Sequence, residues 1–185
     1  MLDAPIPDTA TGAAPAIDWQ ADVFRTLKEQ GVKHVVYVPD AGHSTAIRMA
    51  EADEELHAVV LTTEEKGIGY LAGAWLGGER GALLMQSSGV GNCLNTLALQ
   101  ACARFPLLMV ITMRGDWAEF NAWQNPMGQA TEPALKLMGV MTWRADDPKE
   151  VAPLLHGAAT MAFNGDSACA LLLGQRLIGE KKWVK

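Results

Sequence analysis

Short apolar runs alternate with longer segments of helical spacing along most of the chain. The run from Leu107 to Ile111 contains no polar position, which predicts a strand buried on both faces, because a half-exposed strand would alternate. Strands are predicted at six such runs: residues 35–38, 58–61, 82–85, 107–112, 140–143 and 168–173. Strands separated by helices indicate the α/β class, here an open, mostly parallel sheet of about six strands with helices on both faces.

The chain is expected to hold one domain behind an N-terminal arm. Residues 1–17 are rich in proline and alanine and lack apolar periodicity, so we expect a mobile arm there. From Asp18 the pattern changes to an acidic cap followed by Val23, Phe24 and Leu27 at helical spacing, and Gly31 is expected to close this first helix. The remaining length suits a single core, so residues 18–185 are interpreted as one domain.

The second predicted strand leads into Glu64 at its carboxyl end, which is where open parallel sheets bind their ligands. One interpretation is a threonine-capped helix with acids in its first turn, each worth about 0.3–1 kcal/mol. However, the helix that follows contains Gly67, Gly69 and Gly73, and a helical glycine costs up to about 1 kcal/mol relative to alanine. Such a cost is tolerated where another group approaches the backbone closely, which favours a site at Glu64.

The third predicted strand leads into a glycine-rich turn, Ser88-Gly89-Val90-Gly91-Asn92, which opens another helix. Glycines there allow a ligand to approach the backbone and leave the first helical N–H groups exposed. The turn lacks the third glycine of a dinucleotide fingerprint and the GK[ST] of a P-loop, so a Rossmann-type nucleotide-binding protein is disfavoured. A glycine-rich turn without any ligand is the remaining structural alternative.

The fourth predicted strand is followed by Arg114 and a connection of about 17 residues before a helix expected at Pro133, which exceeds the usual length of a connection. Segments of this kind are usually functional or mobile. Trp117, Phe120 and Trp123 would be unusual in a segment that stays in water. We therefore expect another chain, or the segment itself, to cover these aromatic side chains.

Composition excludes several kinds of partner. The formal net charge of −6 and the absence of a lysine-arginine run argue against nucleic acid. The three cysteines show no CxxC or Cys/His spacing, which indicates a reduced, cytoplasmic compartment and gives no reason to expect a metal site in this chain. No apolar run approaches the roughly 18 residues of a membrane span, so no membrane partner is expected.

Three motifs, in this order, resemble the pyrimidine-binding domain of thiamine diphosphate (ThDP) enzymes. They are the acidic and small residues from Glu64 to Gly73, the turn from Ser88 to Asn92, and Arg114-Gly115 with the later Pro126-Met127-Gly128-Gln129-Ala130-Thr131. The resemblance spans about residues 18–174 and is strongest toward sulfopyruvate and phosphonopyruvate decarboxylases. It implies decarboxylation of a small 2-oxo acid, with sulfopyruvate preferred, and ThDP with Mg²⁺ as cofactors.

The same resemblance implies roles for individual residues. A glutamate of this domain bonds N1′ of the cofactor's aminopyrimidine, and by position that residue is Glu64, with Glu65 as the alternative. The residues expected beside the pyrimidine ring are Gly89, Val90, Gly91 and Asn92. The residues expected on the substrate side are His43, Ser88, Arg114 and Gln124. The planar fork of Arg114 suits a sulfonate or a carboxylate. The other histidines, His34, His57 and His156, have no comparable context.

The resemblance also implies a missing half. ThDP enzymes hold the diphosphate through Mg²⁺ in a second domain that opens on Gly-Asp-Gly/Ser and carries an asparagine further along. Gly165-Asp166-Ser167 imitates this opening, but no asparagine follows, so we interpret it as a turn between the last helix and strand. We therefore expect a separate diphosphate- and Mg²⁺-binding β subunit, with this chain as the α subunit of a hetero-oligomer. The alternatives are phosphonopyruvate or another 2-oxo acid as substrate, and a non-catalytic, ThDP-like regulatory module.

Overall fold

The computed structural model describes residues 17–180, which form one sheet of six parallel strands. The predicted arm, apart from Ile17, lies outside the described residues. The strands are β1 (Val32–Tyr37), β2 (His57–Val60), β3 (Arg80–Gln86), β4 (Leu107–Thr112), β5 (Met141–Ala145) and β6 (Ala168–Leu173). Their order in the sheet is β2-β1-β3-β4-β6-β5. All six predicted strands are confirmed, and β4 is buried at every position, as its unbroken apolar run predicts.

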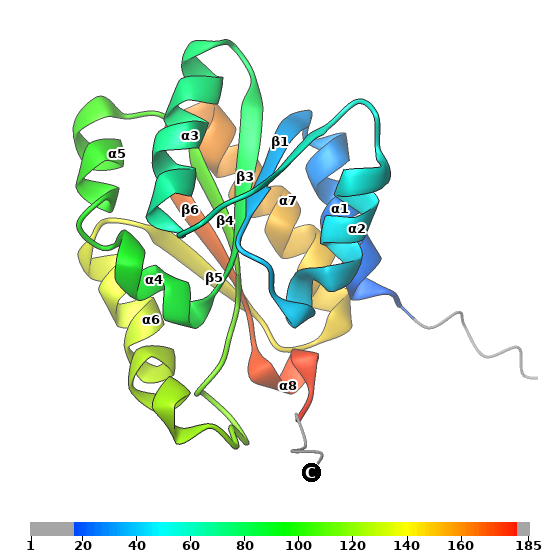
Figure 1. The fold of residues 1–185 in the computed structure, drawn as a ribbon, viewed down its shortest axis with the longest axis vertical. Coiled ribbons are helices and arrows are strands. Elements are labelled where there is room, and N and C mark those ends of the chain that lie inside the picture. Colours follow the sequence, from blue (N-terminus) through cyan, green and yellow to red (C-terminus); the bar gives the residue numbers. More distant parts are fainter. Residues whose placement is uncertain (1–16, 181–185) are drawn as a thin grey trace, which may run out of the picture.

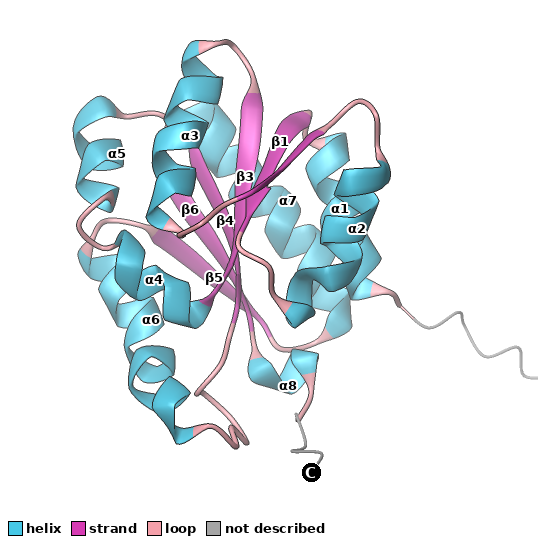
Figure 2. Cartoon of the chain, in the orientation of Figure 1, coloured by secondary structure: helices cyan, strands magenta, loops and turns pink. Residues whose placement is uncertain are grey.

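Helices cover both faces of the sheet (Figures 1 and 2). One face carries α1 (Trp19–Glu29), α2 (Ser44–Ala52) and α7 (Pro148–Gly165). The other carries α3 (Glu65–Leu76), α4 (Ser87–Cys93), α5 (Leu97–Ala103) and α6 (Asn125–Leu137). The short α8 (Gln175–Ile178) follows β6 at the carboxyl end of the strands. Each face has its own hydrophobic core, so the predicted α/β architecture with helices on both sides is confirmed.

Local capping signals set several helix boundaries. The Asp18 side chain accepts a hydrogen bond of 3.1 Å from the backbone N–H of Ala21, so α1 begins where the sequence predicts it. A capping box of Asp147 and Glu150 starts α7. Asp166 ends α7 in the left-handed conformation, with φ 47°, and β6 starts two residues later. The interpretation of Gly165-Asp166-Ser167 as a turn is therefore confirmed.

Two predicted helix boundaries are wrong. Helix α6 begins at Asn125, not at Pro133. Pro126 lies in its first turn, where backbone N–H groups have no partner within the helix, so the missing N–H of a proline costs nothing. A short 3-10 helix, η2 (Ala122–Gln124), leads into it. The glycine-rich turn lies within α4 itself, and the predicted continuous helix breaks after Cys93 and resumes as α5. Because α6 begins at Asn125 rather than at Pro133, the connection after β4 is shorter than predicted.

The strand order creates a switch point between β1 and β3. From β1 the chain passes to β2 on one side, and from β3 it passes to β4 on the other. A crevice at the carboxyl ends of such strands is the usual ligand position in open α/β sheets. The 3-10 helix η1 (Ala41–His43), the start of α4 and the residues after β4 all lie at this edge. Within residues 17–180, no helix combines the length and apolar character that crossing a membrane requires.

Candidate active site

Glu64 directly precedes α3, beyond the carboxyl end of β2. It is 9 % exposed and turns toward α4, where the Asn92 amide donates a hydrogen bond of 2.8 Å to its Oε2. A Cβ atom at Gly89 would overlap the Glu64 carboxyl group, so the close approach of this side chain requires glycine there. In the described structure α3 has no side-chain cap, which disfavours the interpretation of Glu64 as part of a threonine-capped helix start.

The α4 turn combines a buried anchor with an exposed surface. Val90 is fully buried in the core beneath α4, whereas Gly91 and Asn92 are exposed. A side chain at Gly91 would lie 3.2 Å from Sδ of Met127. Of the four residues that the sequence places beside a pyrimidine ring, Gly89 and Asn92 contact Glu64, and Val90 and Gly91 lie between them on α4. This contact with the turn favours Glu64 over Glu65.

A second polar group joins the ends of β1, β3 and β4. Asp40 accepts hydrogen bonds from the Thr112 hydroxyl, at 2.6 Å, and from the Gln86 amide, at 2.9 Å. The Gln86 side-chain oxygen accepts in turn from the Ser88 hydroxyl, at 2.8 Å, and from the Gln124 amide, at 3.2 Å. Two predicted substrate-side residues, Ser88 and Gln124, therefore meet at one glutamine. The Gln124 side-chain oxygen is buried without a hydrogen-bond partner among the described residues.

His43 lies beneath this polar group and is 1 % exposed. Its Nε2 lies 3.2 Å from the Met85 carbonyl oxygen, to which it can donate a hydrogen bond. Burial lowers the pKa of His43, and the negative charge of Asp40 opposes this shift only in part. For Asp40, burial acts to raise the pKa, but the hydrogen bonds from Thr112, Gln86 and the Gly42 backbone, with the attraction of His43, together lower it. His43 is therefore buried near Asp40, and its role on the substrate side stays a prediction.

Arg114 is engaged within the chain. Its Nε and Nη2 donate to the two carboxylate oxygens of Glu119 at 2.5 and 2.6 Å, and its guanidinium lies over the ring of Phe120. The Glu119 side chain is 2 % exposed and also accepts a hydrogen bond of 2.9 Å from Gln175. The hydrogen bond from Arg114, with burial opposing it, lowers the pKa of Glu119 to about 2. The fork predicted to meet a substrate anion is therefore occupied by a carboxylate of the same chain.

The aromatic residues of this connection are exposed: Trp117 at 44 %, Phe120 at 45 % and Trp123 at 76 %. The segment itself covers these rings only in part, with the Arg114 guanidinium over the Phe120 ring and Trp123 the most exposed. Coverage by another chain stays a prediction.

A pocket of about 450 Å³ lies beside α6 and β5 but does not resemble an active site. Its lining includes Asp116, Arg144 and Asp146 and does not include Glu64 or the α4 turn. Arg144 pairs with Asp116 and, at 3.0 Å, with Asp146. Because this pocket lies apart from Glu64 and the α4 turn, the candidate site stays at Glu64 and the switch point.

Sequence reasoning missed four residues that organise this edge: Asp40, Gln86, Thr112 and Glu119. A signal existed for the first three, because each lies at or just beyond the end of a predicted strand. Glu119 had no such signal. It lies in the middle of an irregular connection, and its pairing with Arg114 depends on how that connection folds back.

Comparison with known proteins agrees with this geometry. Residues 18–130 match the family model described as thiamine pyrophosphate enzyme, N-terminal TPP binding domain. The sulfopyruvate decarboxylase subunit alpha of Methanococcus maripaludis is 35 % identical, over 82 % of this chain and 91 % of that protein. Its namesake from Methanothermobacter thermautotrophicus is 33 % identical, over 85 % of this chain and 96 % of that protein. A phosphonopyruvate decarboxylase of Streptomyces viridochromogenes is 32 % identical, over 66 % of this chain but 28 % of its own length.

A solved structure agrees at the level of fold. The 2-oxoglutarate:ferredoxin oxidoreductase from Magnetococcus marinus superposes with a TM-score of 0.72 over 86 % of this chain and 29 % of that chain, at 14 % identity. The family model covers more than half of the chain, and the two α-subunit relatives, both above 30 % identity, match over nearly their full length. This chain therefore belongs to the family of thiamine pyrophosphate enzyme N-terminal, TPP-binding domains.

Proposed function

We propose that this chain is the pyrimidine-binding α subunit of a ThDP-dependent decarboxylase that converts sulfopyruvate to sulfoacetaldehyde and carbon dioxide. The observation that carries the proposal is the Glu64 carboxylate, buried at the start of α3 and held against the α4 turn by Asn92. The names of the full-length relatives support the choice of sulfopyruvate. Phosphonopyruvate is the alternative substrate, supported by a relative of which this chain matches only a part.

The residues around Glu64 fit an aminopyrimidine. A carboxylate has about four acceptor sites, and among the described residues Asn92 alone donates to the Glu64 side chain, so further hydrogen bonds are available. Gly89 leaves room for the carboxyl group, and the exposed Gly91 leaves the backbone open beside it. Glu64 would hold the proton at the pyrimidine nitrogen, and Asn92 would fix the orientation of the carboxyl group.

When bound, ThDP supplies a nucleophilic thiazolium carbon and accepts the electrons released as carbon dioxide leaves. This chain supplies the acid-base group, and Glu64 acts by sharing a proton with the ring nitrogen that it contacts. We expect Ser88 and Gln124, which both donate to Gln86, to lie beside a substrate at the switch point. Because Glu119 occupies Nε and Nη2 of Arg114, we expect the partner subunit to contribute positive charge for the sulfonate.

The proposal requires a second polypeptide, a β subunit that holds the diphosphate through Mg²⁺. The outer face of α3 is suited to such a partner. A Cβ atom at Gly69 or Gly73 would meet nothing within 4 Å, and Leu76 is 88 % exposed. This face belongs to the helix that begins directly after Glu64, so a chain that packs on it lies close to that carboxylate.

Reconstitution tests the proposal. The chain is combined with a diphosphate-binding β subunit, ThDP and Mg²⁺, and carbon dioxide release is measured with sulfopyruvate and with phosphonopyruvate. We expect a higher kcat/KM for sulfopyruvate, no turnover by the chain alone, and a loss of about 100-fold or more in kcat for Glu64→Gln, because proton transfer contributes about 10²–10⁴-fold.

The control is Glu65→Gln, which changes the neighbouring acid and should leave kcat within about threefold. Full activity of the isolated chain would refute its role as a subunit, and normal turnover by Glu64→Gln would refute the mechanism. A reconstituted complex that neither binds ThDP nor turns over would instead favour the non-catalytic, regulatory module.

A further inference from the structure

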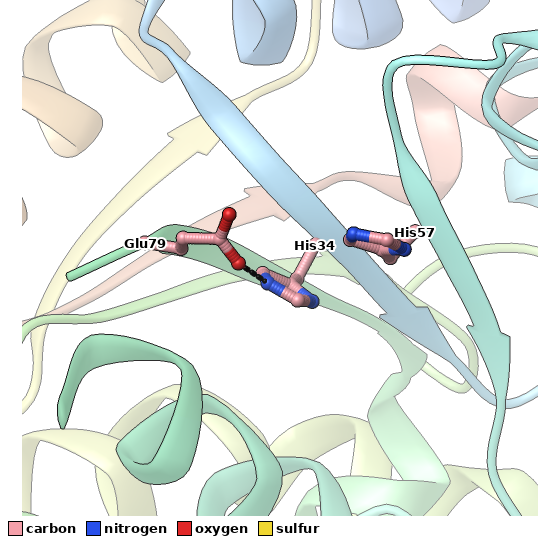
Figure 3. Close-up of side chains that lie close together, drawn as sticks. All are labelled: His34, His57 and Glu79. Carbon is pink, nitrogen blue, oxygen red and sulfur yellow. Dashed lines mark hydrogen bonds and ion pairs between the residues drawn. The ribbon is translucent and has the colours of Figure 1, made fainter. Parts of the chain in front are cut away.

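Three possible metal ligands gather at the amino-terminal end of the sheet, opposite the end that carries Glu64 (Figure 3). His34 lies on β1 and is paired in register with His57 on the neighbouring strand β2. Glu79 lies in the turn after α3, immediately before β3, which flanks β1 on its other side. One ligand atom of each residue lies within 4.8 Å of the others. Strand order therefore brings these three side chains together.

The contacts of His34 suit a metal ligand. Its Nε2 lies 2.5 Å from Oε2 of Glu79, and its Nδ1 lies 3.1 Å from the hydroxyl of Tyr70 on α3. In the tautomer of His34 that satisfies both partners, Nε2 donates to the carboxylate and Nδ1 accepts from the tyrosine hydroxyl. A cation bound to both Nε2 and Glu79 replaces that proton once the exposed Glu79 side chain moves away from its 2.5 Å contact, and Nδ1 then donates to the hydroxyl. Metal-bound histidines usually have such a partner on their second ring nitrogen.

Burial separates the roles of the three ligands. His34 is 8 % exposed and held from both ring nitrogens, whereas His57 and Glu79 are exposed and can adjust. The rings of His34 and His57 stack with centroids 4.9 Å apart, so His57 must turn its nitrogen toward the cation. An exposed side chain can make this movement, and the fixed His34 sets the position of the site.

We propose that His34, His57 and Glu79 form a site for a zinc-type divalent cation, with the remaining coordination position open to solvent. Two imidazoles and one carboxylate form a ligand set that Zn²⁺ uses in proteins, whereas Mg²⁺ prefers oxygen ligands. The bound cation would fasten the edge strand β2 to β1 and to the turn before β3. The alternative is an ion pair between His34 and Glu79, in which His57 has no role. Substitution of His57 therefore distinguishes a cation site from an ion pair.

Titration calorimetry with Zn²⁺ tests the site on the full-length chain without an affinity tag. The background is Cys102→Ser, because the exposed Cys102 thiol could bind zinc on its own. We expect one Zn²⁺ per chain. We also expect the thermal unfolding midpoint to rise by roughly 5 °C or more at a Zn²⁺ concentration about 100 times the Kd. Mg²⁺ at the same concentration should leave the midpoint unchanged.

Variants of the exposed ligands identify the site. His57→Asn and Glu79→Gln should each weaken Zn²⁺ binding at least tenfold, and Tyr70→Phe should weaken it about 10- to 100-fold by removing the partner of Nδ1. The matched control is His156→Asn, an exposed histidine that contacts Gln30, and its Kd should stay within twofold. Absence of Zn²⁺ binding, or unchanged affinity in His57→Asn, would overturn the proposal. If Glu79→Gln weakens Zn²⁺ binding but His57→Asn does not, the cluster is an ion pair between His34 and Glu79 and the proposal fails.

Discussion

Glu119 and Glu64 are two shielded carboxylates at the same edge of the sheet, but their surroundings differ. Glu119 accepts hydrogen bonds from two nitrogens of Arg114, from the backbone of Gly115 and Asn121, and from Gln175. Among the described residues, Glu64 accepts from Asn92 alone. Glu119 has no acceptor capacity to spare, whereas Glu64 has most of its capacity left.

This difference separates structural acids from functional ones. Buried polar groups in folded proteins are normally satisfied, so a shielded carboxylate with unused acceptor sites points to a ligand that completes it. Glu119 ties an irregular connection to the end of β4 and to α8, and it engages two nitrogens of the Arg114 guanidinium. The comparison yields three predictions about the stability of the unbound chain.

The largest effect is expected for Glu119→Gln. A carboxyl group whose pKa falls from the usual 4.5 to about 2 stabilises the fold by roughly 3 kcal/mol at neutral pH, at about 1.4 kcal/mol per pKa unit. Because the pKa of the folded state is depressed, this stabilisation is present above about pH 4.5 and is lost as the pH falls toward 2. Urea unfolding should therefore show a difference in the free energy of unfolding between the native chain and the variant that is large at pH 7 and smaller at pH 3.

The control for this experiment is Glu132→Gln. Glu132 forms an i,i+4 pair of 2.7 Å with the exposed Lys136, and surface pairs of this kind contribute about 0.3–0.5 kcal/mol. Equal stability of Glu119→Gln and Glu132→Gln at pH 7 would contradict the structural role of Glu119.

An intermediate effect is expected for Gly89→Ala. The new methyl group would overlap the Glu64 carboxyl group, and overpacking of this kind typically costs about 1–3 kcal/mol. Gly91→Ala, two residues away, would meet only the flexible end of Met127 and should be within about 0.5 kcal/mol of the native chain or more stable, since alanine favours a helix. Chemical unfolding of the two variants side by side measures the difference, and equal destabilisation would argue against close contact between Gly89 and Glu64.

The smallest effect is expected for Glu64→Gln in the absence of cofactor. The glutamine oxygen can still accept from Asn92, so the free energy of unfolding should change by no more than about 0.5 kcal/mol. Urea unfolding measures this value, and Asn92→Ala checks how much the single hydrogen bond contributes. If Glu64→Gln lowers the free energy of unfolding by several kcal/mol, Glu64 stabilises the fold as Glu119 does, which would argue against a functional role.

Much of the fold was predictable because its signals are local. The buried run of β4, the Asp18 cap and the turn at Asp166 each depend on residues close together in the sequence. The start of α6 was mispredicted because two prolines, Pro126 and Pro133, each suit a helix start, and only packing against α4 and β5 selects the first. The position of Glu64 was predictable for the same local reason, since a strand exit and a helix start define it.

By itself, the sequence determined the strands, their parallel arrangement, the acid at the end of β2 and the family to which the chain belongs. Only the tertiary structure decided which side chains meet. It paired Arg114 with Glu119, buried His43 beneath Asp40, and gathered His34, His57 and Glu79 although no spacing between them suggests a metal site. Periodicity and caps act over a few residues, whereas contacts between distant side chains depend on strand order and register, which only the assembled sheet fixes.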